Sequence, residues 1–196
     1  MTMKERPKYK KIIDAAVEVI AENGFHQAQV SRIAKKAGVA DGTIYLYFKN
    51  KDDLLISLFR EKMGRFVEKI QTEISSKTSV EEKLRAMVAM HFNQLAADKK
   101  LAIVTQLELR QTNRNLRLKV NEALKGYITV IDSILEQGIT EGIFGGTMDI
   151  RLARQMIFGT LDETVTNWVM NDHKYDLSAL AEPVTNLLLG GLESKN

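Results

Sequence analysis

The segment from Val30 to Asp53 constrains the fold more than any other part of the chain, because it holds two short helical patterns separated by a glycine. The first pattern has the spacing of one helix face and consists of Val30, Ile33, Ala34 and Ala37. Gly38 follows, and glycine ends a helix without steric cost. The second pattern repeats the spacing at Ile44, Tyr47 and Phe48. Two helices joined by such a turn indicate a helix-turn-helix, whose second helix enters the DNA major groove.

The charge distribution agrees with a DNA-binding N-terminal part. The whole chain has a net charge of +3, yet residues 1–62 hold 12 of the 28 Lys and Arg and 8 of the 25 Asp and Glu. This region therefore carries +4 and the remainder −1. Runs of Lys and Arg are often only solvated helix faces. Their coincidence with the helix-turn-helix pattern favours phosphate binding.

Composition excludes several classes of protein. The 196 residues include no cysteine, so disulfides, thiolate zinc sites and thiol nucleophiles are absent. No apolar run approaches the roughly 18 residues that span a membrane, and the N-terminus lacks the apolar region of a secretory signal. We expect a cytoplasmic protein that has no membrane partner and needs no cofactor or metal.

Helical periodicity continues through the chain and predicts an all-α protein of about nine helices. The first 50 residues should form the DNA-binding domain, and residues 51–196 a body for effector binding and dimerisation. Asn50 is expected to cap the fourth helix, and Ser79 with Glu82 to form a capping box on the fifth. Pro183 should kink the last helix or delay its start. The expected helices cover residues 7–23, 30–37, 44–48, 51–75, 80–97, 101–112, 116–140, 149–170 and 177–192.

A longer motif gives a more specific identification. The string Gly42-Thr43-Ile44-Tyr45-Leu46-Tyr47-Phe48, followed by Asn50-Lys51 and two aspartates, resembles the DNA-binding signature of the TetR family of bacterial repressors. The chain departs from that signature in two places. Ala28 and Gln29 replace small hydroxylated residues, which removes a helix cap and a phosphate contact. Asp41 replaces a basic residue, so it must cap the helix, accept from a base or lower the affinity for DNA.

The resemblance implies which side chains meet DNA. Thr43 and Tyr45 would reach bases or phosphates, while Phe48 is expected in the core. Tyr47 matches a family aromatic that contacts phosphate, although core packing explains it equally well. Lys51 would share a phosphate with the N–H groups of its helix. The full predicted set is Ser31, Lys35, Lys36, Gly42, Thr43, Tyr45, Tyr47 and Lys51.

A second informative run lies in the middle of the chain. Residues 110–119 hold four positive charges and no negative one. In a continuous helix Arg110, Arg114 and Arg117 would share one side and could bind phosphates. The more common explanation is a solvated basic face paired with Glu108 and Glu122.

The body also resembles a TetR subgroup, the fatty-acid-degradation repressors of Gram-positive bacteria, through LAIVTQLELRQTN, RLARQMIFGT and ETVTNWVMND. That subgroup is released from DNA by long-chain acyl-CoA. The resemblance implies an apolar tunnel for the acyl chain and a basic mouth for the CoA phosphates. For each apolar residue, ordinary core packing is the more common role. The candidate ligand residues are Met63, Phe66, Phe92, Leu95, Ile103, Leu107, Arg110, Asn113, Arg114, Arg117, Met156 and Trp168.

The family resemblance also implies a homodimer on a palindromic operator, paired through the last two helices. Ligand binding would tilt the fourth helix, so that the two recognition helices no longer match major grooves about 34 Å apart. DNA and acyl-CoA must then weaken each other's binding by the same factor.

Other functions compete with this interpretation. A TetR-like repressor that senses another hydrophobic or anionic molecule would have the same N-terminal DNA-binding domain, which we call the head. A helical acyl-CoA-binding protein or an enzyme would leave Gly42 to Lys51 unexplained. No GxSxG, P-loop, HExxH or dinucleotide motif is present, and His26, His91 and His173 lack metal-ligand spacing.

Overall fold

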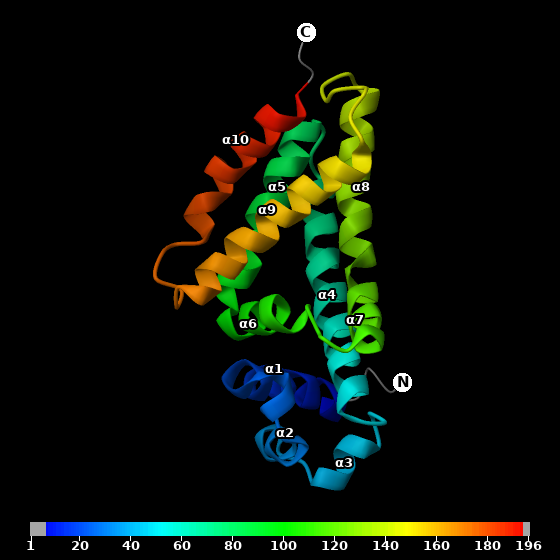
Figure 1. Cartoon of the computed structure of the whole chain (residues 1–196), viewed down its shortest axis with the longest axis vertical. Helices are drawn as coiled ribbons and strands as arrows, with labels where there is room; N and C mark the ends of the chain where they lie inside the picture. The colour runs from blue at the N-terminus through cyan, green and yellow to red at the C-terminus, as the bar shows by residue number, and fades with distance from the viewer. Residues whose placement is uncertain (1–6, 194–196) are drawn as a thin grey trace. The chain divides into compact units, whose positions relative to one another are not determined.

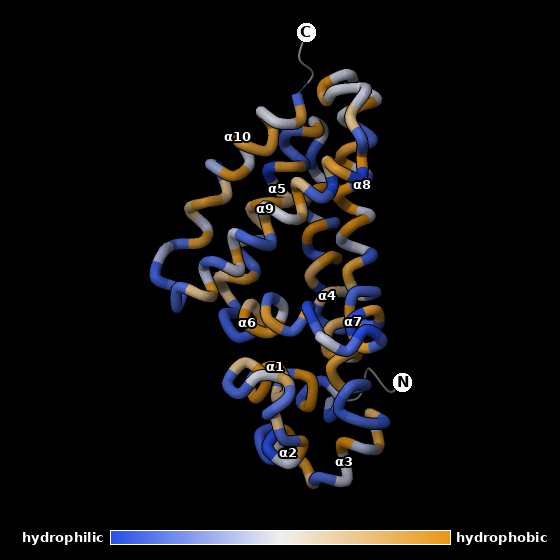
Figure 2. The backbone as a smooth tube through the Cα atoms, viewed as in Figure 1, coloured by the Kyte–Doolittle hydropathy of each residue, from blue (hydrophilic) through white to orange (hydrophobic). Residues whose placement is uncertain are grey.

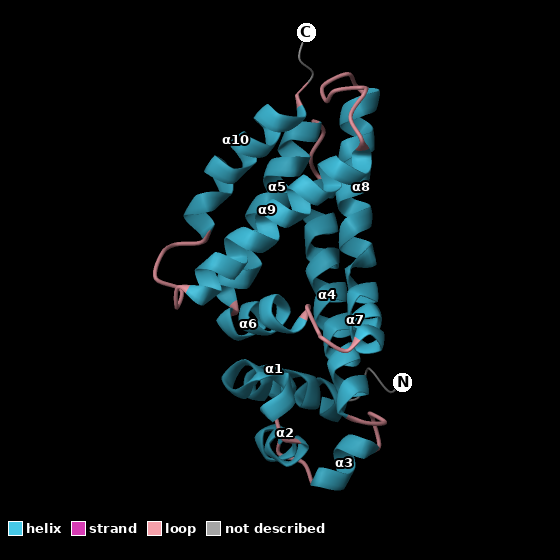
Figure 3. Cartoon of the chain, viewed as in Figure 1, coloured by secondary structure: helices cyan, strands magenta, loops and turns pink. Residues whose placement is uncertain are grey.

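The computed structural model describes residues 7–193, and in this part of the chain helices are joined by loops, without a β-strand (Figures 1 and 3). The predicted all-α class is confirmed. None of the described helices is both long and apolar enough to cross a membrane. The helices are α1 (Pro7–Gln27), α2 (Val30–Ala37), α3 (Asp41–Tyr45), α4 (Lys51–Ser75), α5 (Val80–Ala97), α6 (Lys99–Glu108), α7 (Arg114–Asn121), α8 (Lys125–Thr140), α9 (Ile150–Met170) and α10 (Ala181–Leu192).

The chain divides into two compact units that do not follow its order. Unit 1 combines residues 1–63 with residues 100–123, and unit 2 combines residues 64–99 with residues 124–196. The segment with the arginine run therefore belongs to the same unit as the helix-turn-helix. Helix α4 continues from one unit into the other, since the division falls after Met63.

Two glycines shape the head of unit 1. Gly24 interrupts α1 with a φ of 72°, which ends its regular part where the sequence predicted. Gly38 ends α2 in the left-handed conformation, and the N–H of Val39 donates to the Ala34 carbonyl at 3.0 Å. The N-cap of α2 is Gln29, whose side chain makes no capping bond. The missing cap inferred from Ala28 and Gln29 is thus confirmed.

Unit 2 is a bundle in which α5 contacts α8, α9 and α10, and α9 contacts α8 and α10. Its helices carry apolar residues along their buried faces (Figure 2). The predicted capping box of Ser79 and Glu82 is present at the start of α5. Helix α8 approaches the following loop closely, because a Cβ at Gly138 would lie 2.1 Å from the Phe144 ring. A side chain at this position would clash with the Phe144 ring unless the ring moved.

The helices in the middle of the chain differ from the predicted ones. Helix α6 ends at Glu108 instead of Thr112, and Asn113 caps α7 by accepting from the Leu116 N–H at 3.0 Å. A 3₁₀ turn at Glu122–Leu124 divides the helix predicted for residues 116–140. Arg110 and Arg114 therefore do not share a continuous helix. Near the C-terminus, α10 begins at Ala181 and Pro183 lies in its first turn. The expected delay in the start of the last helix is thus confirmed.

Candidate DNA interface and effector-responsive segment

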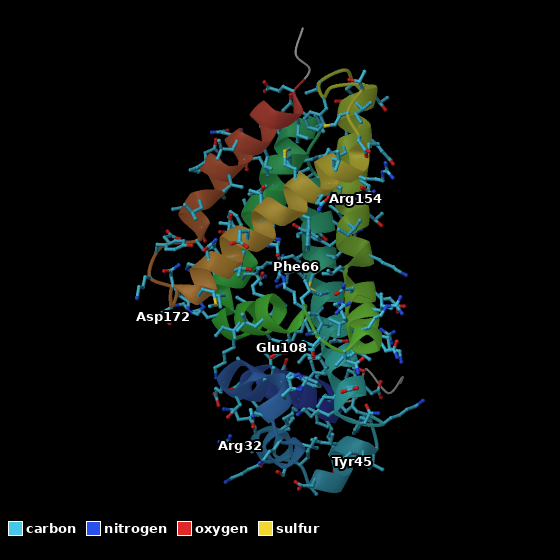
Figure 4. The ribbon with its side chains drawn as sticks, in the orientation of Figure 1. Arg32, Tyr45, Phe66, Glu108, Arg154 and Asp172 are labelled. Atoms are coloured by element: carbon cyan, nitrogen blue, oxygen red, sulfur yellow. The ribbon has the colours of Figure 1, made fainter. Side chains whose placement is uncertain are left out.

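The recognition helix α3 presents a polar outer side and an apolar inner side. Tyr45 is 58% exposed, whereas Ile44 and Phe48 are 2% exposed. Phe48 stacks on Tyr9 of α1 with 5.3 Å between ring centroids, and Tyr47 tilts against the same ring at 6.2 Å. This aromatic cluster anchors the end of α3 to α1 and leaves Tyr45 at the surface (Figure 4).

The other predicted DNA residues lie on or beside the two short helices. Ser31, Lys35 and Lys36 are exposed on α2, Gly42 is exposed on α3, and Thr43 is half-buried there. Asp41 is the first residue of α3, and the N-cap is Ala40 without a side-chain bond. Of the roles expected for Asp41, side-chain capping is therefore not present.

Lys36 is held within unit 1 by an acidic residue of α1. Its ammonium lies 2.7 Å from the Glu18 carboxylate, which also pairs with Lys100 of α6 at 2.9 Å. Hydrogen bonds from Lys36 and Lys100 hold the pKa of Glu18 below its ordinary value. A DNA phosphate would compete with Glu18 for the Lys36 ammonium.

Lys51 has a structural partner as well. Its Nζ donates to the His26 carbonyl at 2.8 Å and lies 4.8 Å from the centroid of the Phe25 ring. Partial burial lowers the pKa of Lys51. Asn50 caps α4 as predicted, with its Oδ1 accepting from the Asp53 N–H at 2.9 Å. Lys51 therefore ties the start of α4 to the interrupted end of α1.

The sequence did not predict a second residue that holds the interrupted end of α1. Glu108, at the end of α6, accepts from the Phe25 N–H at 2.7 Å and from the Gln111 Nε2 at 2.6 Å (Figure 4). Gln111 in turn accepts at its backbone oxygen from Arg117 Nη1 at 2.9 Å. The only signal for Glu108 in the sequence was an acid beside the arginine run.

The three arginines have different surroundings. Arg110 donates to the Gln106 carbonyl at 3.1 Å and Arg117 to the Gln111 carbonyl. Arg114 is exposed in the first turn of α7. Asn113 serves as a cap and also lines a groove of about 390 Å³ in unit 1, together with Lys49, Asn50, Asp52 and Lys119. The basic segment thus borders the last residues of the DNA-binding motif.

The apolar ligand candidates differ in burial. Five of them have exposed fractions of 8% or less: Met63, Phe66, Phe92, Leu95 and Trp168. Ile103 is half-buried, whereas Leu107 and Met156 are 47% and 37% exposed. Their expected interior position is not found in the single chain, because Leu107 lies at the last turn of α6 and Met156 on the outer face of α9. The indole N–H of Trp168 donates a hydrogen bond to the Tyr175 carbonyl at 2.8 Å.

Comparisons with known proteins match both parts of the chain. Residues 12–58 fit the model of bacterial regulatory proteins of the tetR family, and residues 59–191 fit that of the YsiA-like protein C-terminal region. The chain belongs to the TetR family. It is therefore a DNA-binding transcriptional regulator with a helical C-terminal domain, and the family predicted from Gly42 to Lys51 is confirmed.

Several relatives are similar over nearly their whole length. The fatty acid metabolism regulator protein of Bacillus subtilis is 63% identical over 97% of this chain and 98% of its own length. The fatty acid degradation regulator FadR of Bacillus halodurans is 69% identical, with a TM-score of 0.91 over 94% of this chain and 100% of that structure. FadR of Bacillus subtilis in complex with stearoyl-CoA is 63% identical, with the same TM-score and coverage.

Replacement of Lys51 by alanine tests the phosphate contact predicted from the motif. We expect Lys51→Ala to weaken binding to all DNA sequences alike and to reduce the slope of log Kd against log salt by about one unit. The measurement is fluorescence anisotropy at several salt concentrations. Lys62→Ala is the matched control, because Lys62 on the same helix pairs with Asp14 at 2.6 Å. An unchanged slope in Lys51→Ala would remove Lys51 from the interface.

Proposed function

We propose that this regulator represses fatty-acid-degradation genes as a homodimer on palindromic operator DNA and is released by long-chain acyl-CoA. One observation carries the proposal: a solved structure that is 63% identical, with a TM-score of 0.91, holds stearoyl-CoA. The buried apolar candidates, Phe66, Phe92 and Leu95 among them, suit an acyl chain. Arg114 suits a CoA phosphate, because an exposed guanidinium can form a bidentate bond with it.

Ligand titration tests this function directly. Palmitoyl-CoA at about 100 times its Kd should stabilise the protein by about 2.7 kcal/mol, which raises Tm by roughly 5–10 °C. The same ligand should release the protein from operator DNA in an anisotropy assay. Arg114→Gln should weaken acyl-CoA binding more than about fivefold and leave fatty-acid binding unchanged. Arg151→Gln is the matched control, because Arg151 is exposed and pairs with Asp149.

Absence of any shift with acyl-CoAs, in protein that still binds palindromic DNA, would leave a TetR repressor of another ligand. If palmitate stabilised the protein as much as palmitoyl-CoA does, Arg114 would have no role in binding a CoA phosphate.

The outer faces of α9 and α10 support the homodimer. Leu152 and Leu187 are 65% and 75% exposed on these faces. Met156 joins the two faces, since its methyl carbon would lie 3.4 Å from a Cβ at Gly191. The large apolar residues of α10 have two different surroundings, because Val184, Leu188 and Leu189 are buried while Leu187 is exposed. A second copy of this chain is the partner that the family implies for this face.

A charge at Leu187 should break this dimer. We expect Leu187→Glu to give monomers in sedimentation velocity and to weaken operator binding more than about tenfold, because one head reads only a half-site. Folding should persist, since the wild-type side chain is exposed. Leu118→Glu, at a 51% exposed leucine of α7, should stay dimeric. A dimeric Leu187→Glu protein would argue against pairing through α10.

Release would follow from the bonds within unit 1. A phosphate bound at the arginine segment competes for Arg117, which otherwise holds the Gln111 carbonyl. Gln111 is the neighbour of Glu108, and Glu108 holds the Phe25 N–H. Loss of the first bond thus loosens the turn at Gly24 to His26, against which Lys51 and the start of α4 rest. We propose that this sequence of contacts carries the ligand signal to α3.

A further inference from the structure

A buried polar pair lies among aromatic rings in the interior of unit 2. His91 on α5 is 7% exposed and Tyr127 on α8 is 1% exposed. The Tyr127 hydroxyl lies 2.8 Å from Nδ1 of His91. Phe66 of α4, labelled in Figure 4, meets the imidazole edge-on, with 5.3 Å between ring centroids. Phe158 of α9 meets the Tyr127 ring in the same way at 6.1 Å. Four helices therefore contribute to one interior cluster.

Both polar side chains are neutral in this environment. Burial lowers the pKa of His91 to about 3, so the imidazole is uncharged at neutral pH. Burial also raises the pKa of Tyr127, so the phenol keeps its proton. A neutral imidazole has one N–H and one bare nitrogen. The 2.8 Å contact fits either tautomer; we assign the donor role to the Tyr127 hydroxyl and the imidazole proton to Nε2.

That second nitrogen is unusual. Nε2 of His91 is buried and has no hydrogen-bond partner within residues 7–193. Buried N–H groups are almost always paired, because the lost hydration is otherwise not offset. The contacts proposed for repression and release use neither His91 nor Tyr127. The pair therefore needs an explanation of its own, and a donor N–H requires an acceptor.

We propose that His91 determines ligand specificity by donating from Nε2 to the thioester carbonyl of the bound acyl-CoA. This inference rests on the proposed function, which supplies the ligand. The thioester carbonyl is an uncharged acceptor at the start of the acyl chain. A neutral donor among Phe66, Phe92 and Tyr127 favours such a group over a carboxylate, whose burial without a counter-charge is costly. The same contact thus selects thioesters against free fatty acids.

The test compares palmitoyl-CoA with S-hexadecyl-CoA, a thioether in which CH₂ replaces the carbonyl. Calorimetry on the full-length protein should show about tenfold tighter binding of the thioester. In His91→Phe this preference should fall below about twofold, through loss of thioester affinity alone. His91→Gln retains an N–H donor and should keep part of the preference. Phe92→Leu is the matched control from the same cluster: both ligands should weaken together and their ratio should stay constant.

Each other outcome is decisive. Equal binding of the two ligands to the wild type would overturn the inference and leave the proposed function intact. A preference that survives in His91→Phe would mean that Nε2 meets a buried water or that the ring only packs. Failure of the wild type to bind either ligand would reject the proposed function together with this contact. The wild-type ratio needs no variant, so a misfolded variant cannot obscure the result.

Discussion

The hydrogen bond from the Phe25 N–H to Glu108 joins the end of α1 to the end of α6, and the proposed coupling of ligand and DNA binding depends on it. Gly24 breaks α1 just before the helix-turn-helix, and the exposed backbone of that break needs partners. Glu108 supplies one from the end of α6, and Lys51 supplies another from the start of α4. Residues far apart in sequence thus fix the entry of the chain into α2. A TetR-family head is held here by the same segment that carries the arginines.

The basic residues near the candidate binding sites already have partners within the protein. Lys36 pairs with Glu18, Lys51 with a carbonyl, and Arg117 with the Gln111 carbonyl. In the proposed complexes a DNA or CoA phosphate competes with these partners, so the net gain would be smaller than the number of positive charges suggests. Such competition would couple phosphate binding to rearrangement of unit 1, as coupling between two ligands requires.

Local signals in the sequence predicted most of the fold and located the helices that carry the candidate DNA interface. Gly24, Gly38, Asn50 and the Ser79 capping box act within one turn, so they could be recognised without tertiary structure. The break between α7 and α8 could not, because residues 122–124 include neither glycine nor proline. Glu108 was missed for the same reason, since its partner Phe25 is 83 residues away. The prediction that three arginines share one helix face was wrong, because Asn113 caps a new helix inside the run.

The coupling between acyl-CoA and DNA binding in Glu108→Gln tests the central claim most directly. The quantity is the ratio of operator Kd with saturating palmitoyl-CoA to operator Kd without it, checked by the reciprocal effect of DNA on ligand binding. We predict that Glu108→Gln keeps each separate affinity within about threefold but lowers the ratio at least about fivefold. Glu22→Gln, which removes an exposed carboxylate paired with Lys100, should keep the wild-type ratio. An unchanged ratio in Glu108→Gln would contradict the account.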